Sequence, residues 1–230
     1  MTPRLASVIL PVYNQAGHIG EILAEHAGVL AQLPFPIEIL PVVNGRRLDN
    51  SLEVCRGLEG RYPVIRTLRV EEGGWGRAVR AGLAAAQGDL LCYSNSARTA
   101  TSELTLMLLY ASVHQGSVVK ANRKIRDSWV RRLGSLLYNL ECRALFDLAY
   151  WDINGTPKVF PRALTDLAGL QREDDLIDLE FNVVCRRRQY PVIEVPIFSA
   201  RRHSGRSTTG LRSAIRMYWG AIQMRRRWGR

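Results

Sequence analysis

Several features that would mark particular classes of protein are absent from this sequence. The four cysteines lie far apart, with no C-x-x-C pair and no histidine at ligand spacing, which argues against a zinc site or a disulfide framework. No stretch approaches the roughly 18 apolar residues of a transmembrane helix, and the first residues do not resemble a signal peptide. We therefore expect a cytoplasmic protein, or one that contacts a membrane from the cytoplasmic side.

Lysine is scarce, and acidic residues are missing from the C-terminal part. Only three of the 32 basic residues are lysines, no acid follows Glu194, and nine arginines lie within residues 195–230 of a chain whose net charge is +11. A general bias towards arginine would explain the scarcity of lysine but not this clustering. Arginine grips phosphate through a planar fork, so the pattern predicts an anionic partner, either a phosphorylated substrate or anionic lipid headgroups. Nucleic acid is not expected, because the charge is accompanied by no recognised motif.

The first half of the chain alternates apolar runs with amphipathic stretches. The 230 residues, 47% of them hydrophobic, are enough to bury one substantial core. The runs at 6–12, 37–43, 64–70 and 90–93 predict strands, and the stretches at 18–32, 49–58 and 77–87 predict helices. This order favours an α/β fold with a mostly parallel sheet flanked by helices. Because ligands bind at the carboxyl ends of such strands, the loops after Val12, Val43, Val70 and Tyr93 are expected to form one site.

The second half is less regular. It predicts helices at 104–114, 129–149 and 173–187, and strands at 117–119, 157–160 and 192–197. The last stretch, 211–230, mixes Tyr218, Trp219 and Trp228 with arginines and predicts a basic amphipathic C-terminal helix. Such a helix either lies on a membrane surface or packs its apolar stripe against the rest of the protein.

Ordered motifs over roughly residues 5–210 resemble family 2 glycosyltransferases. Val8-Ile9-Leu10-Pro11-Val12-Tyr13-Asn14-Gln15 is similar to the family's P-x-Y-N-E loop, and Gly76-Arg77-Ala78-Val79-Arg80-Ala81-Gly82-Leu83 to its G-K-x-x-A-L-x-x-G-L helix. Asp152-Ile153-Asn154-Gly155-Thr156-Pro157-Lys158-Val159-Phe160 is similar to D-x-x-S-G-F-(R/K)-x-(F/Y). Further matches are Val118-Val119-Lys120-Ala121-Asn122-Arg123, Asp178-Leu179-Glu180, Tyr190-Pro191-Val192-Ile193-Glu194-Val195-Pro196-Ile197 and Arg202-His203-Ser204-Gly205-Arg206-Ser207-Thr208.

The resemblance is greatest to the dolichol-phosphate mannosyltransferase-like branch, which includes polyprenyl-phosphate glycosyltransferases. It implies a GT-A (Rossmann-like) domain over residues 1–210, followed by the C-terminal helix at 211–230. It also implies an inverting enzyme that moves a sugar from a nucleotide-sugar to a phosphorylated polyprenyl or similar acceptor. A phosphate acceptor is already ionised and needs no strong general base.

The departures from the family pattern fall on carboxylates. The family's Asp-Asp-Gly-Ser is Val43-Asn44-Gly45-Arg46 here, the Glu of P-x-Y-N-E is Gln15, and Asp-x-Asp is lost in Ser94-Asn95-Ser96-Ala97. The family leads one to expect Mg²⁺ or Mn²⁺, which require anionic oxygen ligands, and those ligands are missing. We therefore expect no metal ligands in this chain and a reaction that is metal-independent.

The candidate site residues follow from these matches. For catalysis they are Asn95, Asp178 and Glu180. For binding the nucleotide-sugar they are Pro11, Tyr13, Gln15, Asn44, Gly76, Arg77 and Asn95. For binding phosphate, in place of the metal, they are Arg123, Arg131, Arg202 and Arg206.

A different class of function stays open at this point. The polar residues at Gln15, Asn44 and Asn95 are equally compatible with plain loop positions, and Arg131 and Arg206 with a solvated surface. The alternative is a catalytically degenerate GT-A module that binds a ligand or a partner protein and transfers nothing. A retained binding chamber favours the enzyme, and a filled one favours the binding module.

Overall fold

A single twisted sheet organises the chain. The computed structural model describes residues 2–46, 49–123, 129–198 and 211–228, with the side chains of α5 and α8 described from residues 133 and 215 onwards. Its seven strands lie in the order β3-β2-β1-β4-β6-β5-β7. They are β1 (Ala6–Val12), β2 (Ile37–Asn44), β3 (Leu68–Val70), β4 (Leu90–Tyr93), β5 (Val118–Arg123), β6 (Lys158–Pro161) and β7 (Val192–Ile197).

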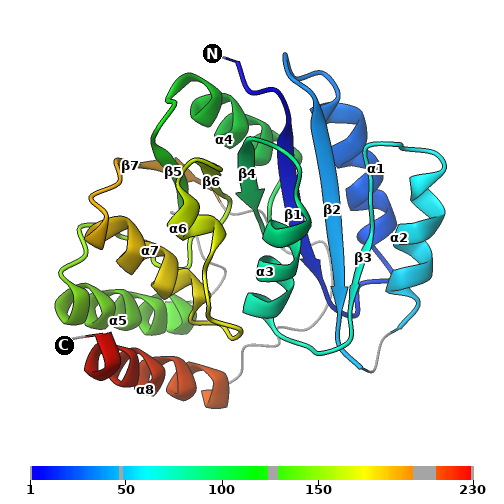
Figure 1. The fold of residues 1–230 in the computed structure, drawn as a ribbon. Helices are drawn as coiled ribbons and strands as arrows, with labels where there is room; N and C mark the ends of the chain where they lie inside the picture. Colours follow the sequence, from blue (N-terminus) through cyan, green and yellow to red (C-terminus); the bar gives the residue numbers. More distant parts are fainter. Residues whose placement is uncertain (1, 47–48, 124–128, 199–210, 229–230) are drawn as a thin grey trace.

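One strand runs against the others. β6 pairs antiparallel with both β4 and β5, whereas the other neighbouring strands pair in parallel. The predicted mostly parallel sheet is therefore confirmed. Because β1, β2, β3 and β4 share a direction, their carboxyl ends meet along one edge, at the bottom of the view in Figure 1.

Helices cover both faces of the sheet (Figure 1). The helices are α1 (Ile19–Leu30), α2 (Ser51–Glu59), α3 (Trp75–Ala85), α4 (Thr101–Val113), α5 (Trp129–Phe146), α6 (Thr165–Ala168), α7 (Ile177–Arg187) and α8 (Leu211–Trp228). α1, α2 and α4 share a core cluster with Val8 and Leu10 of β1. α3, α6 and α7 share a second cluster with Ile9 on the other face. Since alternate residues of β1 meet different helices, the strand is buried along its whole length and mostly apolar.

A third cluster joins α5 and α8 to the outer side of α7. Leu179 and Val183 of α7 pack there, with Cys142 of α5 and Met224 of α8. The predicted C-terminal helix is thus present as α8, and its residues Ala221 and Met224 pack on the protein. None of the helices described here is long and apolar enough to cross a membrane.

The observed elements differ from the predicted ones at several ends. The strand expected at 64–70 is a regular strand only from Leu68, with one isolated bridge at Ile65. The helix expected from 173 begins at Ile177, because Asp174 accepts from the backbone N–H of Leu176 and closes a turn first. The helix expected to reach 149 ends at Phe146, where Asp147 takes a positive φ of 52°. Local turns set the ends of these two helices, and the hydrophobic periodicity does not reveal such turns.

The helix α3 approaches β1 closely at Gly82. A Cβ at this position would collide with the side chain of Ile9. Gly28, by contrast, lies exposed in α1 with nothing near the place of a Cβ. The same substitution therefore has opposite consequences at the two sites.

We predict that Gly82→Ala lowers the free energy of unfolding by about 1–3 kcal/mol, because the added methyl overpacks the interface of α3 with β1. Gly28→Ala, the matched control, is expected to raise it by about 0.5–1 kcal/mol through helix propensity. Urea unfolding of the two variants measures both changes. Equal effects would contradict this description of the α3–β1 packing.

Candidate active site

The carboxyl ends of β1, β2 and β4 gather the residues predicted to bind a nucleotide-sugar. Gln15 follows β1, Asn44 ends β2 and Asn95 follows β4. Ser96 Oγ donates to Gln15 Oε1 at 2.9 Å and to the carbonyl of Pro11 at 3.3 Å, which joins the loops after β1 and β4. Tyr13 points outwards and is 44% exposed. The structure thus brings these predicted residues together at one edge.

The side chain of Asn44 links three segments through hydrogen bonds. Its Nδ2 donates to the carbonyl of Val12 at 3.0 Å, and its Oδ1 accepts from the backbone N–H of Gly74 at 3.0 Å. The side chain is buried. Because an aspartate has no donor for the Val12 carbonyl, an amide is the residue type that satisfies both contacts. The neutral residue at this position therefore has a structural use.

We predict that Asn44→Asp destabilises the fold by about 1–3 kcal/mol, because a carboxylate would then face the buried Val12 carbonyl without a proton to share. Asn50→Asp, at the exposed N-cap of α2, makes the same chemical change and is expected to be neutral or slightly stabilising. Thermal unfolding at neutral pH compares the two. An Asn44→Asp protein as stable as the parent would contradict the role of the Asn44 hydrogen bonds in holding these segments together.

The tip after β4 is a turn held by its own hydrogen bonds. Asn95 Oδ1 accepts from the backbone N–H of Ala97 at 3.1 Å. Ser94 Oγ lies 2.7 Å from Thr99 Oγ1. The acceptor oxygen of Asn95 is thus used inside the turn, while its amide hydrogens make none of these bonds.

Asp178 lies at the start of α7 and links three other elements. It accepts from Trp75 Nε1 of α3 at 3.1 Å and from Tyr93 Oη of β4 at 3.0 Å, and it pairs with Lys158 Nζ of β6. Lys158 is fully buried. Burial lowers the pKa of Lys158 to about 8, against the opposing pull of Asp178. Burial and the nearby Asp178 charge raise the pKa of Tyr93, so its hydroxyl stays a proton donor.

Two further ion pairs, Arg123–Asp152 and Lys120–Glu194, lie close to the pair of Lys158 with Asp178. Arg123 Nε and Nη2 donate to Asp152 at 2.7 and 2.8 Å, a two-pronged contact. Lys120 Nζ donates to Glu194 at 3.0 Å and to the backbone carbonyl of Asp152 at 2.7 Å. The guanidinium of Arg123, predicted to bind phosphate, is thus turned towards Asp152.

Glu180 and Arg77 hold a loop against α3. The carboxylate of Glu180 accepts from the backbone N–H groups of Gln171 and Arg172, at 2.9 and 2.7 Å. Arg77 pairs with Glu173 at 2.7 Å. A Cβ on Gly76 would meet the backbone of residues 172–174, so only glycine permits this approach. The loop at 171–174 therefore covers the start of α3.

The structure does not describe the side chains of the other three arginines predicted to bind phosphate. Residues 202 and 206 lie outside the residues that the structure describes, and the side chain of Arg131 is not described either. Conversely, sequence reasoning did not select Trp75, Tyr93 or Lys158. A lysine inside the strand Pro157-Lys158-Val159-Phe160 was the available signal, because a charge in a buried strand requires a partner.

The residues present do not suit the divalent metal of the family. At the tip after β4 the side chains are those of Asn95, Ser96 and Ala97, and the oxygen of Asn95 is already bonded within the turn. Asp178 and Asp152 are paired with buried cations. Across the described ranges, no group of three or more His, Cys, Asp or Glu side chains is placed to hold a metal ion.

A family model described as glycosyl transferase family 2 matches residues 7–154. The chain belongs to that family. The match begins in β1 and ends just after Asp152, so it includes the edge described above. The predictions of family and of the GT-A fold class are thereby confirmed.

Curated relatives and solved structures agree with this assignment. The undecaprenyl-phosphate 4-deoxy-4-formamido-L-arabinose transferase of Aeromonas hydrophila is 26% identical over 95% of this chain and 67% of its own length. That of Edwardsiella ictaluri is 25% identical over 96% and 68%. The chain thus spans about two thirds of the length of these relatives.

The fold is shared with glucosyl-3-phosphoglycerate synthase from Mycobacterium tuberculosis. Its crystal structure with Mn²⁺, UDP and phosphoglyceric acid has a TM-score of 0.74 at 18% identity, covering 96% of this chain and 78% of that one. A second structure of that enzyme was crystallised with Mg²⁺ and UDP. The likeness confirms the fold.

We predict that Asp178→Asn lowers the free energy of unfolding by about 3–5 kcal/mol, because it leaves Lys158 as an unpaired buried charge. Adding Lys158→Met to that variant is expected to recover part of the loss, with a coupling of at least about 1 kcal/mol. Chemical unfolding of the two single variants and the double variant measures the coupling. Strict additivity would contradict a direct buried pair.

Proposed function

We propose that the chain transfers a sugar, with inversion, from a nucleotide-sugar to a polyprenyl phosphate or a similar phosphorylated acceptor. The names of the curated relatives support the acceptor class, since both act on undecaprenyl phosphate. One observation at the site carries the proposal further. Asp152, Asp178 and Glu180, three of the acids that match family positions, all use their carboxylates in ion pairs or backbone hydrogen bonds.

This pairing suits an acceptor that needs no general base. An oxygen of the acceptor phosphate is already ionised, so it attacks the anomeric carbon directly. A new C–O bond forms as the bond to the diphosphate breaks, and the nucleoside diphosphate leaves with that electron pair. The arginines at 202 and 206, and at 123 and 131, are the proposed cations for the phosphates. Two nitrogens of the Arg123 guanidinium, Nε and Nη2, already donate to Asp152.

The donor is proposed to bind across the carboxyl edge. Tyr13 is exposed and offers a ring face to the base, while Gln15 and Asn95 offer amide hydrogens to hydroxyl groups. Pro11, Asn44, Gly76 and Arg77 are proposed to support the donor through the backbone and loop contacts described above. Asn95 is our proposed contact to the reacting sugar. The contacts of Asp178 and Glu180 support a positioning role for both, through Lys158 and the loop at 171–172 respectively.

The expected place of action follows from the acceptor. A lipid-borne phosphate and a soluble nucleotide-sugar meet at the membrane surface, so we propose a cytoplasmic protein that works on the inner membrane face. Nucleic acid is not a proposed partner. The basic α8 is the notable candidate for membrane contact.

One observation favours the degenerate binding module as the second candidate. The polar groups at the tip after β4 bond to one another and to Gln15, an arrangement that needs no ligand to be complete. Such a module would hold a ligand or partner without transferring sugar. Nucleotide binding and product formation separate the two candidates.

We predict that UDP or GDP binds in the absence of metal, and that Mn²⁺ changes the affinity by no more than about twofold, because the anionic ligands are missing. The variant Asn95→Asp/Ala97→Asp restores two carboxylates and is expected to acquire Mn²⁺-dependent binding. Calorimetric titration of both proteins, with and without Mn²⁺, measures these affinities.

Three results are informative. Failure of the parent to bind either nucleotide under both conditions would overturn the transferase proposal. Strict Mn²⁺ dependence of the parent would overturn the proposed role of the arginines. Binding without any sugar transfer to a polyprenyl phosphate would favour the degenerate module.

A further inference from the structure

The helix α5 exposes a stripe of four leucines. Leu133, Leu136, Leu137 and Leu140 follow the i, i+3, i+4, i+7 spacing and are 48%, 45%, 51% and 47% exposed. This spacing places them on one side of the helix. The opposite side of α5 carries Tyr138, Cys142 and Phe146, which are buried in the third core cluster. The helix is therefore apolar on its solvent side as well as on its core side.

The helix α8 has a shorter exposed apolar face. Ile215 and Trp219, four residues apart, are 61% and 53% exposed. Exposed arginines accompany them, at 216 and at 225–227, and the helix contains no acid. Apolar and aromatic side chains flanked by arginine are the composition of helices that lie at an anionic membrane surface.

The two helices form one surface. Tyr218 Oη donates to the carbonyl of Gly134 at 2.6 Å, and its ring meets that of Tyr138 edge-on at 5.5 Å. Both helices turn their buried sides to the same core cluster and run side by side in the same direction (Figure 1). Their solvent sides therefore face away from that cluster together. We call Leu133, Leu136, Leu137, Leu140, Ile215 and Trp219 the α5–α8 surface.

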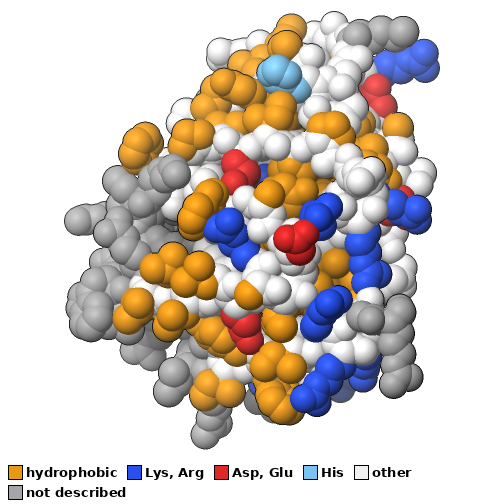
Figure 2. All heavy atoms as spheres, turned by 90° about the vertical axis from the view of Figure 1, so that its left-hand side faces the viewer, with side chains coloured by type: hydrophobic (Ala, Val, Ile, Leu, Met, Phe, Trp, Pro, Cys, Tyr) orange, Lys and Arg blue, Asp and Glu red, His pale blue; other side chains and the backbone are white. Residues whose placement is uncertain are grey.

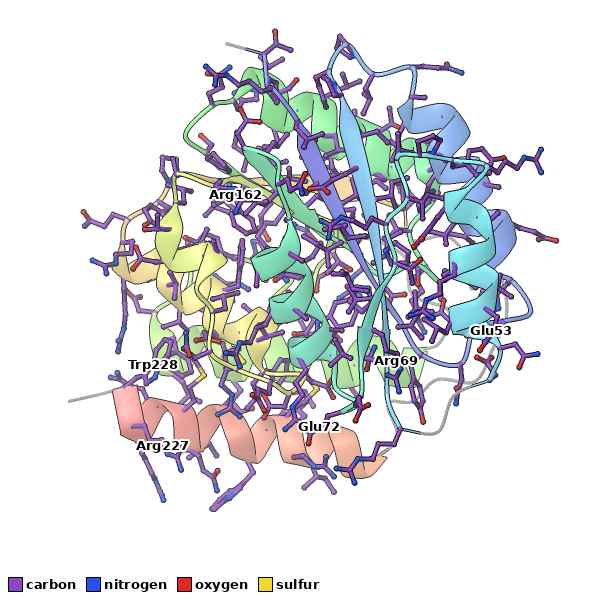
Figure 3. All side chains as sticks on the ribbon, turned by 45° about the vertical axis from the view of Figure 1, so that its right-hand side comes forward. Glu53, Arg69, Glu72, Arg162, Arg227 and Trp228 are labelled. Carbon is purple, nitrogen blue, oxygen red and sulfur yellow. The ribbon has the colours of Figure 1, made fainter. Side chains whose placement is uncertain are left out.

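The location of this surface matches the proposed chemistry. α8 lies at the lower side of the molecule, which is the side where β2 and β3 end (Figures 1 and 3). Figure 2 shows hydrophobic side chains over much of the adjoining face, with basic side chains gathered along its lower right-hand margin. A bilayer contacting the α5–α8 surface would thus lie beside the carboxyl edge of the sheet.

We infer that the α5–α8 surface docks on a bilayer rich in anionic headgroups. The leucines and Trp219 enter the interface between headgroups and acyl chains, and the arginines of α8 contact lipid phosphates. The inference rests on the proposed function in that a lipid-borne acceptor makes a bilayer the relevant partner. It adds α5, whose leucines are the larger apolar part of the surface.

Charge disfavours a second copy of the chain as the occupant. A symmetric contact through this surface would bring the arginines of two α8 helices towards each other, and no acid of α8 is available to balance them. Anionic headgroups, by contrast, complement that charge.

Vesicle co-sedimentation of the full chain tests the inference. The vesicles contain phosphatidylcholine alone or with about one third phosphatidylglycerol, which supplies the anionic surface. Leu136→Asp/Leu137→Asp is expected to weaken binding to the anionic vesicles at least about tenfold. The matched control is Leu106→Asp/Leu109→Asp, a pair on the exposed side of α4 that is 43% and 37% exposed and lies away from α5. It is expected to stay within about twofold of the parent.

A second variant removes the leucines without introducing negative charge. Leu136→Gln/Leu137→Gln removes apolar area alone and is expected to weaken binding in the same direction. Equal vesicle binding by the parent and both α5 variants would overturn the inference, as would equal loss in the α4 control. A parent that sediments as a dimer, and becomes monomeric only in the α5 variants, would assign the surface to a second copy instead.

Nucleotide titration separates this inference from the proposed function. The α5 variants are expected to bind UDP or GDP as the parent does, because the substituted leucines face away from the site. Vesicle binding that depends on the leucines, in a chain that binds no nucleotide, would support the surface and overturn the transferase. Nucleotide binding with vesicle binding insensitive to α5 would overturn the surface alone.

Discussion

The pairing of Lys158 with Asp178 is the constraint on which the centre of the molecule depends. Lys158 belongs to β6, the one reversed strand, and its ammonium group is fully buried. Such a charge is tolerated only with a partner, and Asp178 supplies it from α7 while also accepting from Tyr93 and Trp75. One carboxylate thus sets α7, β4, β6 and the start of α3 relative to each other, directly behind the proposed site.

This use of acids leaves the proposed chemistry to neutral and basic groups. Carboxylates at positions that match the family are here part of the scaffold: Asp178 pairs with Lys158, Asp152 pairs with Arg123, and Glu180 holds the loop at 171–172. Arginines are used in the same structural way. Arg69 donates to the carbonyl of Gly45 at 2.7 Å, and Arg162 to those of Gly88 and Ala86 (Figure 3). Some of the arginines therefore cap backbone carbonyls at the ends of strands and helices.

The amide at Asn44 shows why a lost carboxylate need not mean a lost site. Asn44 exchanges hydrogen bonds with Val12 and Gly74, and so keeps the ends of β1 and β2 beside α3. Both contacts are made by a neutral amide. The α5–α8 surface extends the same part of the molecule with apolar side chains, so donor, acceptor and bilayer are proposed to meet along one side of the sheet.

The sequence by itself determined the alternation of strands and helices, the family and the loops that meet at the carboxyl edge. These follow from local periodicity and from motifs whose spacing is written in the chain. Only the tertiary structure decided that Asp178 pairs with Lys158, that Arg123 turns to Asp152, and that four leucines of α5 stay exposed beside α8. The physical reason is that an amphipathic pattern or a charged residue specifies a need for a partner, whereas packing between distant segments selects the partner.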